Sequence, residues 1–580
     1  MKKQHTIMEV ILAVCLIAVV GIAWACRDQV LEDLQHPAAH EVAKAIAGLH
    51  GKARPQQPKP KRKAPARKKP LIIITGTVRD TAGIPLPDVV VSDGYSCTKT
   101  DTAGQYKMAR HEKAKFIFYT VPDYCEVTTH SEADHTACFY QPVADSLRVY
   151  DFTLTRLPNG KETSYRMIVI GDPQITNAMN PYYTRADENA VQKSDLERFT
   201  SQTMTDIRRT IRRLPKGAPV YGLSMGDNVQ YYGGYNEALE RQMRQALGDS
   251  DMRLFSVIGN HDNDGRPVYV EKWEEQWGPT DYSFDRGDQH YVCLNNVHYT
   301  RRGGYYSPGE LTDDQMRWLR QDLALADKQK QVVLCYHVPF TFGPTPQATS
   351  KRLGALLALL KPFRGGYQLF CGHTHFAVIH EIQHQGQPVM EHCHAAACGN
   401  IWQSNINLCG TPNGYYIYTF DGIRMGNAQY KGTFWEADKQ MTLFRADTDF
   451  NGESYAADWN LPTGRNILIA NVFNADSRWK VEAIEEGRDP QPMQRLSGRN
   501  QDAFATGYHH RFAQATPYHF VGKQNTYLIM NHLFYYEPQH PDVPVTVRAT
   551  DPYGNVYTAS SSEVITEPFM NFAHYYKNGK

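Results

Sequence analysis

The spacing of apolar positions changes twice along residues 71–580 and divides them into three regions. In residues 71–157, short apolar runs such as LIIITGTVRD alternate with glycine-containing turns, which predicts a β-sandwich. In residues 163–411, strand-like apolar runs alternate with helical periodicity, which predicts helices layered on a sheet. Residues 412–580 return to short strands such as NILIANVF. We therefore expect an α/β core flanked by an N-terminal β-sandwich and a C-terminal β-rich domain.

Two helix starts in the central region have the pattern of a capping box. Ser194 is followed three residues later by Glu197, and Thr312 is followed in the same way by Gln315. Behind the first box, apolar residues repeat at helical spacing, namely Leu196, Phe199, Ile207, Ile211 and Leu214. Both segments are predicted to be amphipathic helices that cover the sheet.

The first 26 residues have the pattern of an export signal. Lys2 and Lys3 precede an apolar run, Val10–Cys26, in which Ala23-Trp24-Ala25 resembles a cleavage site. The run also reaches the lower length limit of a membrane span, and Cys26 stands where a lipid anchor would be attached. A cleaved signal peptide, an uncleaved membrane anchor and a lipoprotein therefore remain open. All three predict an exported protein that is periplasmic or envelope-anchored.

Residues 27–70 are predicted to be a basic, proline-rich linker. Residues 51–70 alone hold nine Lys or Arg and five Pro but no acidic residue. Because the rest of the chain has 53 basic and 61 acidic residues, the formal net charge of +1 conceals an acidic body. We expect membrane or envelope association through the N-terminus and no nucleic-acid groove in the body.

Polar side chains that bind metals follow five of the apolar runs in the central region. Since the carboxyl ends of strands in an open α/β sheet meet in one crevice, these groups are expected to converge there. The neighbouring glycines permit sharp turns and close approach of the backbone. In chain order, the residues are Asp172 with Gln174, Asp227, Asn260 with His261, His337, and His373 with His375.

This combination resembles the calcineurin-like metallophosphoesterase superfamily, whose pattern is D-x-H, GD, GNHD, H and GHxH. The resemblance implies a four-layer α/β/β/α core over residues 163–411 that holds two divalent metal ions, with Mn, Zn or Fe as the candidates. The flanking regions are similar to those of bacterial three-part members, and residues 71–157 resemble a transthyretin-like module. By analogy, the first ion would be held by Asp172, Gln174, Asp227 and His375. The second would be held by Asp227, Asn260, His337 and His373.

Hydrolysis of a phosphate ester requires charge neutralisation and a nucleophile at neutral pH. Two cations bridged by Asp227 and by a hydroxide would supply both, and the substrate is expected to be a phosphate ester, with monoesters favoured over diesters. His261 lies next to a ligand in sequence and is the candidate general acid for the leaving group. Asp262 and Asp264 are both candidates to orient it. Gln174 is the single departure from the family pattern, because it stands where histidine is usual.

Two other functions are compatible with parts of the sequence. Gly222-Leu223-Ser224-Met225-Gly226 matches the nucleophile elbow of a serine esterase, although Asp227 and a turn-like YYGGY follow instead of a helix. A non-catalytic envelope binding protein on a degenerate phosphoesterase core is the second alternative, with Gln174 as its only support. Loss of activity on metal chelation would exclude the esterase, and turnover of a phosphoester would exclude the binding protein.

Overall fold

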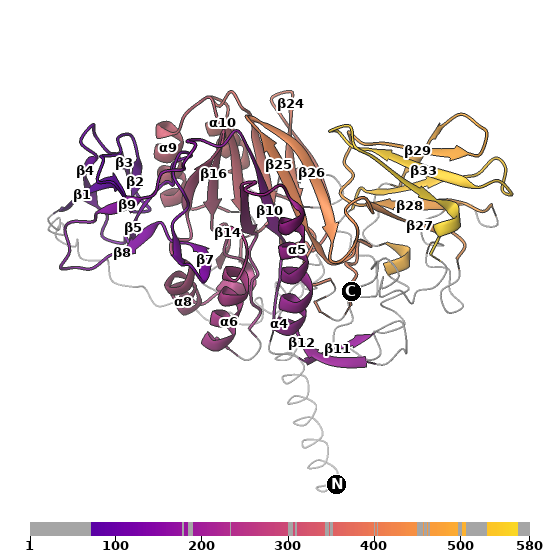
Figure 1. Cartoon of the computed structure of the whole chain (residues 1–580), viewed down its shortest axis with the longest axis horizontal. Coiled ribbons are helices and arrows are strands. Elements are labelled where there is room, and N and C mark those ends of the chain that lie inside the picture. Colours follow the sequence, from indigo (N-terminus) through magenta and orange to yellow (C-terminus); the bar gives the residue numbers. More distant parts are fainter. Residues whose placement is uncertain are drawn as a thin grey trace, which may run out of the picture. The chain divides into compact units, whose positions relative to one another are not determined.

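The structure is a computed structural model, and it describes most of residues 71–565 (Figure 1). The segments outside the description are 1–70, 177–178, 184–189, 232–233, 300–305, 308–309, 343–346, 349–351, 400, 403, 449–455, 457–460, 462–464, 497–501, 506–529 and 566–580. The predicted export signal and the basic linker lie outside the described residues. Among the described helices, none has the length and apolar character required to cross a bilayer.

The N-terminal region consists mainly of two small sheets. One has the strand order β4-β1-β9 (Gln105–Arg110, Ile72–Asp80, Phe152–Leu154) and the other β3-β2-β5-β8 (Cys97–Lys99, Val90–Ser92, Phe116–Tyr119, Tyr140–Pro142). The DTAG sequence forms the same turn twice, because Asp80 and Asp101 each accept hydrogen bonds from the backbone N–H groups two and four residues later. Buried side chains alternate along β4, as a half-buried strand requires.

The central region is built around two sheets. The first has the order β26-β25-β10-β13-β14-β7-β6, in which β10, β13 and β14 are parallel (Ser164–Ile170, Val220–Ser224, Arg253–Ser256). The second has the order β15-β16-β19-β22-β24-β23, in which the four inner strands are parallel. Its strands are Tyr282–Arg286, Gln289–Leu294, Gln331–Tyr336, Tyr367–Cys371, Gln387–Cys393 and Val378–His384.

Helices cover the outer face of each sheet, which gives the expected four-layer core (Figure 1). Along β10, Ile168 and Ile170 pack in one apolar cluster with the helices α5, α6 and α8, whereas Met167 and Val169 pack in a second cluster that contains residues of both sheets. That cluster also includes the apolar faces of α9 and α10. The helices are α5 (Thr205–Arg213), α6 (Glu237–Gly248), α8 (Pro267–Trp277), α9 (Asp313–Leu325) and α10 (Leu353–Leu360).

Both predicted capping boxes are confirmed. Ser194 and Glu197 cap α4 (Asp195–Arg198), and Thr312 and Gln315 cap α9. The apolar face that was expected to form one helix after Ser194 is interrupted by a π-helical turn, Phe199–Met204, between α4 and α5. A π-turn shifts the register of side chains by one residue, and such turns are frequent near functional sites.

The sheet boundaries differ from the divisions expected in the sequence. The hairpin β6–β7 (Thr129–Ser131 and Asp134–Ala137) comes from the N-terminal region but extends the first core sheet, beside β14. At the opposite edge, β25 and β26 (Gly414–Asp421 and Arg424–Gly432) belong to the same sheet, although they follow the expected division at 411. The flanking regions therefore contribute strands to the core.

The C-terminal region is rich in β-structure, as expected. Two four-stranded sheets have the orders β27-β28-β32-β31 and β30-β29-β33-β34. Leu468, Ala470, Val481 and Val547 are among the buried residues of their shared core. The strands are Met441–Arg445, Leu468–Val472, Leu533–Tyr536, Gln494–Arg495, Gln491–Pro492, Lys480–Glu485, Val545–Thr550 and Val556–Ser560.

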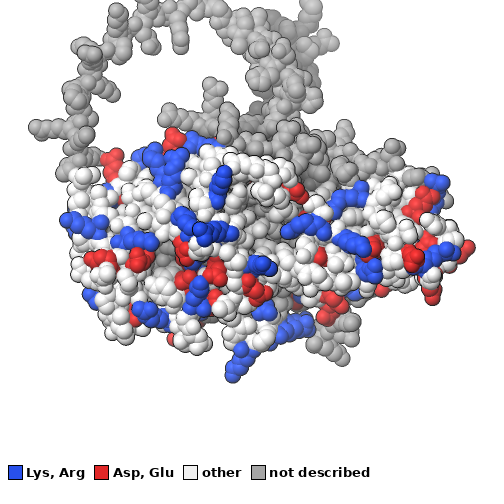
Figure 2. Space-filling view, turned by 90° about the horizontal axis from the view of Figure 1, so that it is seen from above, with Lys and Arg blue, Asp and Glu red and all other residues white. Residues whose placement is uncertain are grey.

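Charged side chains are distributed over the described surface in both signs. Figure 2 shows lysine and arginine interspersed with aspartate and glutamate on the face that it presents. Many of them form exposed ion pairs, such as Arg241 with Glu237 and Lys272 with Glu275. Pairs of this kind contribute little to stability but keep the surface hydrated.

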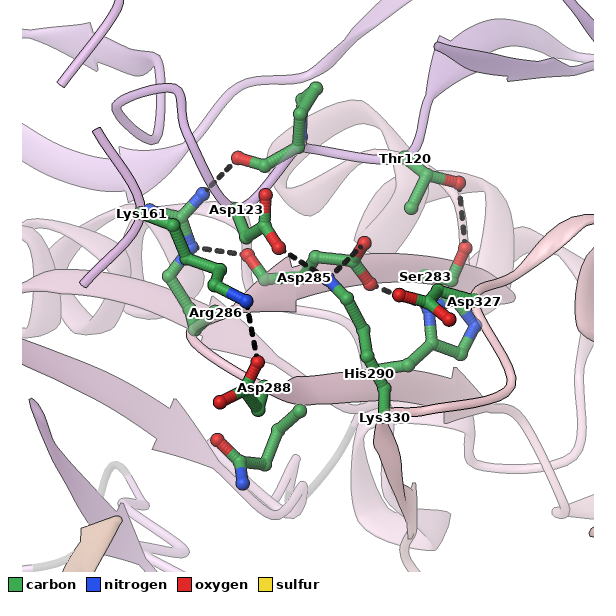
Figure 3. Close-up of polar contacts among 12 residues, drawn as sticks. Thr120, Asp123, Lys161, Ser283, Asp285, Arg286, Asp288, His290, Asp327 and Lys330 are labelled. Atoms are coloured by element: carbon green, nitrogen blue, oxygen red, sulfur yellow. Dashed lines mark hydrogen bonds and ion pairs between the residues drawn. The ribbon is translucent and has the colours of Figure 1, made fainter. Parts of the chain in front are cut away.

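Polar contacts join the N-terminal region to the second core sheet (Figure 3). The ammonium of Lys330 lies 2.7 Å from a carboxylate oxygen of Asp123 and 2.7 Å from one of Asp285. Arg286 donates to the backbone carbonyls of Pro122 and Cys125. Lys330 is 5% exposed and Arg286 is fully buried. Without these partners, the burial of either charge would be strongly destabilising.

Replacement of Lys330 by methionine is expected to lower the free energy of unfolding by roughly 3 kcal/mol, because it leaves the largely buried Asp123 without this cation and leaves Asp285 with only His290. Lys161→Met is the matched control, since the exposed Lys161 pairs with Asp288 at 2.6 Å in the same region. Loss of this exposed ion pair should lower the free energy of unfolding by about 1 kcal/mol or less. Urea unfolding measures both, and equal losses would show that Lys330 is not a buried partner.

Candidate metal centre

The predicted ligands lie at the carboxyl ends of five parallel strands from both sheets. In the first sheet, Asp172 follows β10, Asp227 follows β13 and Asn260 follows β14. In the second sheet, His337 follows β19, and His373 and His375 follow β22. Strand ends of both sheets therefore contribute to one site, as expected from the motifs.

Five of the predicted ligands have left-handed backbone conformations, which non-glycine residues rarely adopt. Conformations of this kind cost about 1–3 kcal/mol each and cluster at functional sites, where they turn a side chain into a cavity. The residues and their φ angles are Asp172 (34°), Gln174 (43°), Asp227 (50°), His373 (69°) and His375 (61°).

Glycines allow the motif loops to approach one another. A Cβ atom on Gly259 would lie 2.1 Å from both the backbone nitrogen and Oδ1 of Asp227. A Cβ atom on Gly226, whose φ is +94°, would lie 2.8 Å from Nδ1 of His337. Side chains at these two positions would displace the predicted ligands, which explains the glycine in each motif.

Asp227, Asn260, His337 and His373 form one closely spaced group. Nε2 of His337 lies 3.1 Å from Oδ2 of Asp227 and 2.9 Å from Oδ1 of Asn260. Nδ1 of His373 lies 2.8 Å from the same Asn260 oxygen. One ligand atom each from Asp227, His337 and His373 lies within 4.8 Å of the others, which is a spacing that suits a shared cation.

Asp172 and His375 lie beside this group. Oδ1 of Asp172 is 3.8 Å from Nε2 of His337 and 3.9 Å from Nε2 of His375. Both carboxylate oxygens of Asp172 also accept the backbone N–H of His373, at 3.0 Å. Asp172 is therefore positioned between the ends of β10 and β22.

The side chain of Gln174 has one satisfied end and one unsatisfied end. Its Nε2 donates to Oε1 of Gln230 at 3.0 Å, whereas its own Oε1 is buried and has no hydrogen-bond partner among the described residues. An unsatisfied buried oxygen costs about 1–3 kcal/mol. A cation would satisfy it, so this atom fits a metal ligand.

The electrostatics of the group also fit a cation. Burial raises the pKa of Asp172 to about 8, assisted by the nearby Asp227 carboxylate and opposed by His337. Burial lowers the pKa of His373 to about 3 and that of His375 to about 4, so both imidazoles are neutral at physiological pH. The Asp227 carboxylate outweighs burial and raises the pKa of His337 to about 9, so binding of a divalent ion would release protons from His337 and Asp172. After that release, imidazoles and closely spaced carboxylates are the donors that a divalent transition-metal ion requires.

Residues behind the ligands hold them in place. Nδ1 of His337 lies 2.8 Å from the carbonyl oxygen of Met225, which directs Nε2 toward the site. Trp402 is fully buried and donates from its indole to the carbonyl of Pro173, so it packs behind the first loop. The sequence around Trp402 does not reveal this contact, because it joins residues 229 positions apart.

His261 lies at the edge of the group, partly exposed, and its backbone N–H donates to Oδ1 of Asp227 at 2.8 Å. The two carboxylates expected to orient it have other partners. Asp262 accepts the backbone N–H groups of Gly259 and Val229, and Asp264 pairs with Arg266. Both acidic residues thus stabilise the loop and its surroundings.

The serine of the esterase-like motif is not arranged as a nucleophile. Ser224 is the last residue of β13, is fully buried, and donates its hydroxyl to Oδ1 of Asn228. The next helix, α6, begins only at Glu237. Asn228 in turn donates to Ser256, so Ser224 belongs to a hydrogen-bond chain that fixes the Asp227 loop.

A four-layer core with an aspartate and histidine cluster at its strand ends has the architecture of a metallophosphoesterase. Three family models match the chain along most of its length. They are the N terminal of calcineurin-like phosphoesterase (residues 72–157), calcineurin-like phosphoesterase (165–377) and the C terminal of calcineurin-like phosphoesterase (391–557). The chain therefore belongs to the calcineurin-like phosphoesterases, with family-specific domains on both sides of the core.

Similarity to solved structures is distant. A purple acid phosphatase from yellow lupin (Lupinus luteus) seeds is 11% identical with a TM-score of 0.29, and the match covers 59% of this chain and 66% of that one. The sulfate thiohydrolase SoxB of Thermus thermophilus is 13% identical with a TM-score of 0.27, over 48% of this chain and 57% of that one. No curated protein matches the chain.

Proposed function

We propose that the protein is a metal-dependent phosphoesterase that hydrolyses a phosphate ester, with monoesters preferred over diesters. The observation that carries this proposal is the convergence of Asp227, His337 and His373 within 4.8 Å, in a chain of the calcineurin-like family. The family implies a phosphoester substrate, and the buried ligand group supplies the donors for the cations that such a substrate needs.

The assignment of the ligands to two sets follows the pattern of the family that the chain resembles. Asp172, Gln174, Asp227 and His375 would hold the first ion, and Asp227, Asn260, His337 and His373 the second. Asn260 joins His337 and His373 through one oxygen, and Asp172 lies beside His375. Bound Mn²⁺, Zn²⁺ or iron would supply positive charge for the phosphoryl oxygens and lower the pKa of water.

The protein's own groups have separate roles in this proposal. Asp227 belongs to both ligand sets, and the backbone N–H of His261 holds its Oδ1 in place. The imidazole of His261 is the general acid, which transfers its proton to the ester oxygen of the leaving group. Its partial exposure leaves it accessible to a substrate that enters from solvent.

The location of this activity follows from the N-terminal sequence. We propose that the folded body is exported and is periplasmic or attached to the envelope through residues 1–70. The support is the apolar run Val10–Cys26 behind two lysines, followed by the basic linker.

Asp227→Asn is expected to be the most damaging ligand substitution, because one carboxylate serves both ions. Metal content and hydrolysis of a panel of phosphomonoesters and diesters with added Mn²⁺ measure the effect. Asp264→Asn is the matched control, since this nearby carboxylate pairs with Arg266 and should retain both ions and activity. Near wild-type turnover of Asp227→Asn with two ions bound would refute the two-metal proposal. Two bound ions without turnover of any phosphoester by the wild type would favour a binding protein.

His261→Ala is expected to keep both ions and to slow turnover by ~10²–10⁴-fold on substrates with poor leaving groups. Activated aryl phosphates should be affected less, because their leaving groups need no proton. Steady-state kinetics on an alkyl and an aryl phosphate test the difference. The same loss on both substrates, or loss of metal, would rule out the role of general acid.

Residues 1–70 are expected to direct a fused reporter out of the cytoplasm. The fusion partner should be an enzyme that is active only after export, and its activity in intact cells is the measurement. A control with Val10–Cys26 deleted should be inactive. An inactive fusion with the intact segment that accumulates in the cytoplasm would contradict export.

A further inference from the structure

Gln174 and Gln230 lie side by side because the backbones of their loops are joined. The N–H of Gln174 donates to the carbonyl of Asp227 at 2.7 Å, and the N–H of Gln230 donates to the carbonyl of Ile175 at 2.8 Å. Between these bonds, Ile175 and Val229 form a parallel bridge. The backbone therefore holds the two residues next to each other, so that their amides can form a hydrogen bond.

The two ends of an amide have opposite character, so its orientation decides whether it can bind a cation. The oxygen is a ligand, whereas the NH₂ group is a donor that a cation repels. Rotation by 180° exchanges them at little steric cost. A glutamine ligand therefore requires a neighbour that distinguishes its two ends, which is the role that hydrogen-bonded neighbours have for other metal ligands.

Gln230 makes this distinction in the structure. Its Oε1 accepts the hydrogen of Gln174 Nε2 at 3.0 Å, and Gln174 Oε1 is left buried and without a hydrogen-bond partner among the described residues. Gln174 is 2% exposed, so bulk water has little access to that oxygen. This hydrogen bond leaves Oε1 of Gln174 available as a ligand, in a site whose other candidate ligands are carboxylates, an amide and imidazoles.

We propose that Gln230 is a positioning residue of the metal centre, which holds the Gln174 amide with its oxygen available to the first ion. The inference rests on the proposed function, because it assumes that a cation binds there. It goes beyond the ligand set, because Gln230 belongs to no motif and does not itself contact the ion. Removal of its acceptor should weaken one metal-binding step and leave the other unchanged.

The test is calorimetric titration of the metal-free, full-length protein with Mn²⁺. Gln230→Leu should weaken one of the two binding steps about tenfold, which is the usual scale for such a neighbour. Gln230→Glu should retain that step, because a carboxylate accepts the same hydrogen. Gln230→Met, which keeps the length of the side chain, replaces the leucine variant if circular dichroism shows that the latter is not folded.

A double-mutant comparison separates positioning from a general structural effect. In the Gln174→Ala background, Gln230→Leu should have no further effect on metal binding, since there is no amide to orient. An unchanged titration of Gln230→Leu in the wild-type background would overturn the positioning role. The same tenfold loss in the Gln174→Ala background would also overturn it. If the wild type itself bound fewer than two ions, the proposed function would fail first, and the positioning role with it.

Discussion

The burial of two carboxylates at neighbouring strand ends is the constraint on which the candidate site depends. Asp172 and Asp227 are 0% and 1% exposed, and both have left-handed backbones. Their mutual repulsion and their loss of hydration are costly unless cationic or donor groups surround them. His337 and the backbone N–H groups of His261 and His373 meet this requirement, and the glycines let the loops approach closely enough. Two sheets are needed because one sheet edge cannot surround the carboxylates from both sides.

The same need for a rigid support extends to the flanking regions. β7 and β25 extend the sheet that carries Asp172 and Asp227, on opposite sides of it. Lys330 and Arg286 fix the N-terminal region to the sheet that carries His337. β25 and β7 are joined to the core by ladder hydrogen bonds, which a separation of these strands from the sheet would break. Strands from both flanking matches thus complete the first core sheet, whereas β27 to β34 form two further sheets around their own core.

The sequence predicted the class of secondary structure in each region. It also predicted which strand ends carry the candidate metal ligands. These features are local, since an apolar period, a capping box such as Ser194 with Glu197, or a glycine next to Asp227 is readable within a few residues. The pairing of β25 with β10 was not predicted, because it joins residues about 250 positions apart, such as Ser164 and Asp421. The contact between Gln174 and Gln230 was missed for the same reason, since neither glutamine has a signal that identifies the other as its partner.

The replacement of histidine by Gln174 makes the proposed site asymmetric. The first ligand set then offers three oxygen donors, from Asp172, Gln174 and Asp227, and one imidazole, whereas the second offers two imidazoles. Oxygen donors suit harder ions such as Mn²⁺, and imidazole suits zinc and iron. A neutral amide also binds less strongly than an imidazole, so the first ion depends more on how well the amide is oriented. In the positioning role that we propose, the backbone bridge between Ile175 and Val229 brings Gln230 beside Gln174, and Gln230 offers an acceptor to the NH₂ end of the Gln174 amide. The departure from the family pattern and its compensation therefore lie in two loops that the backbone already joins.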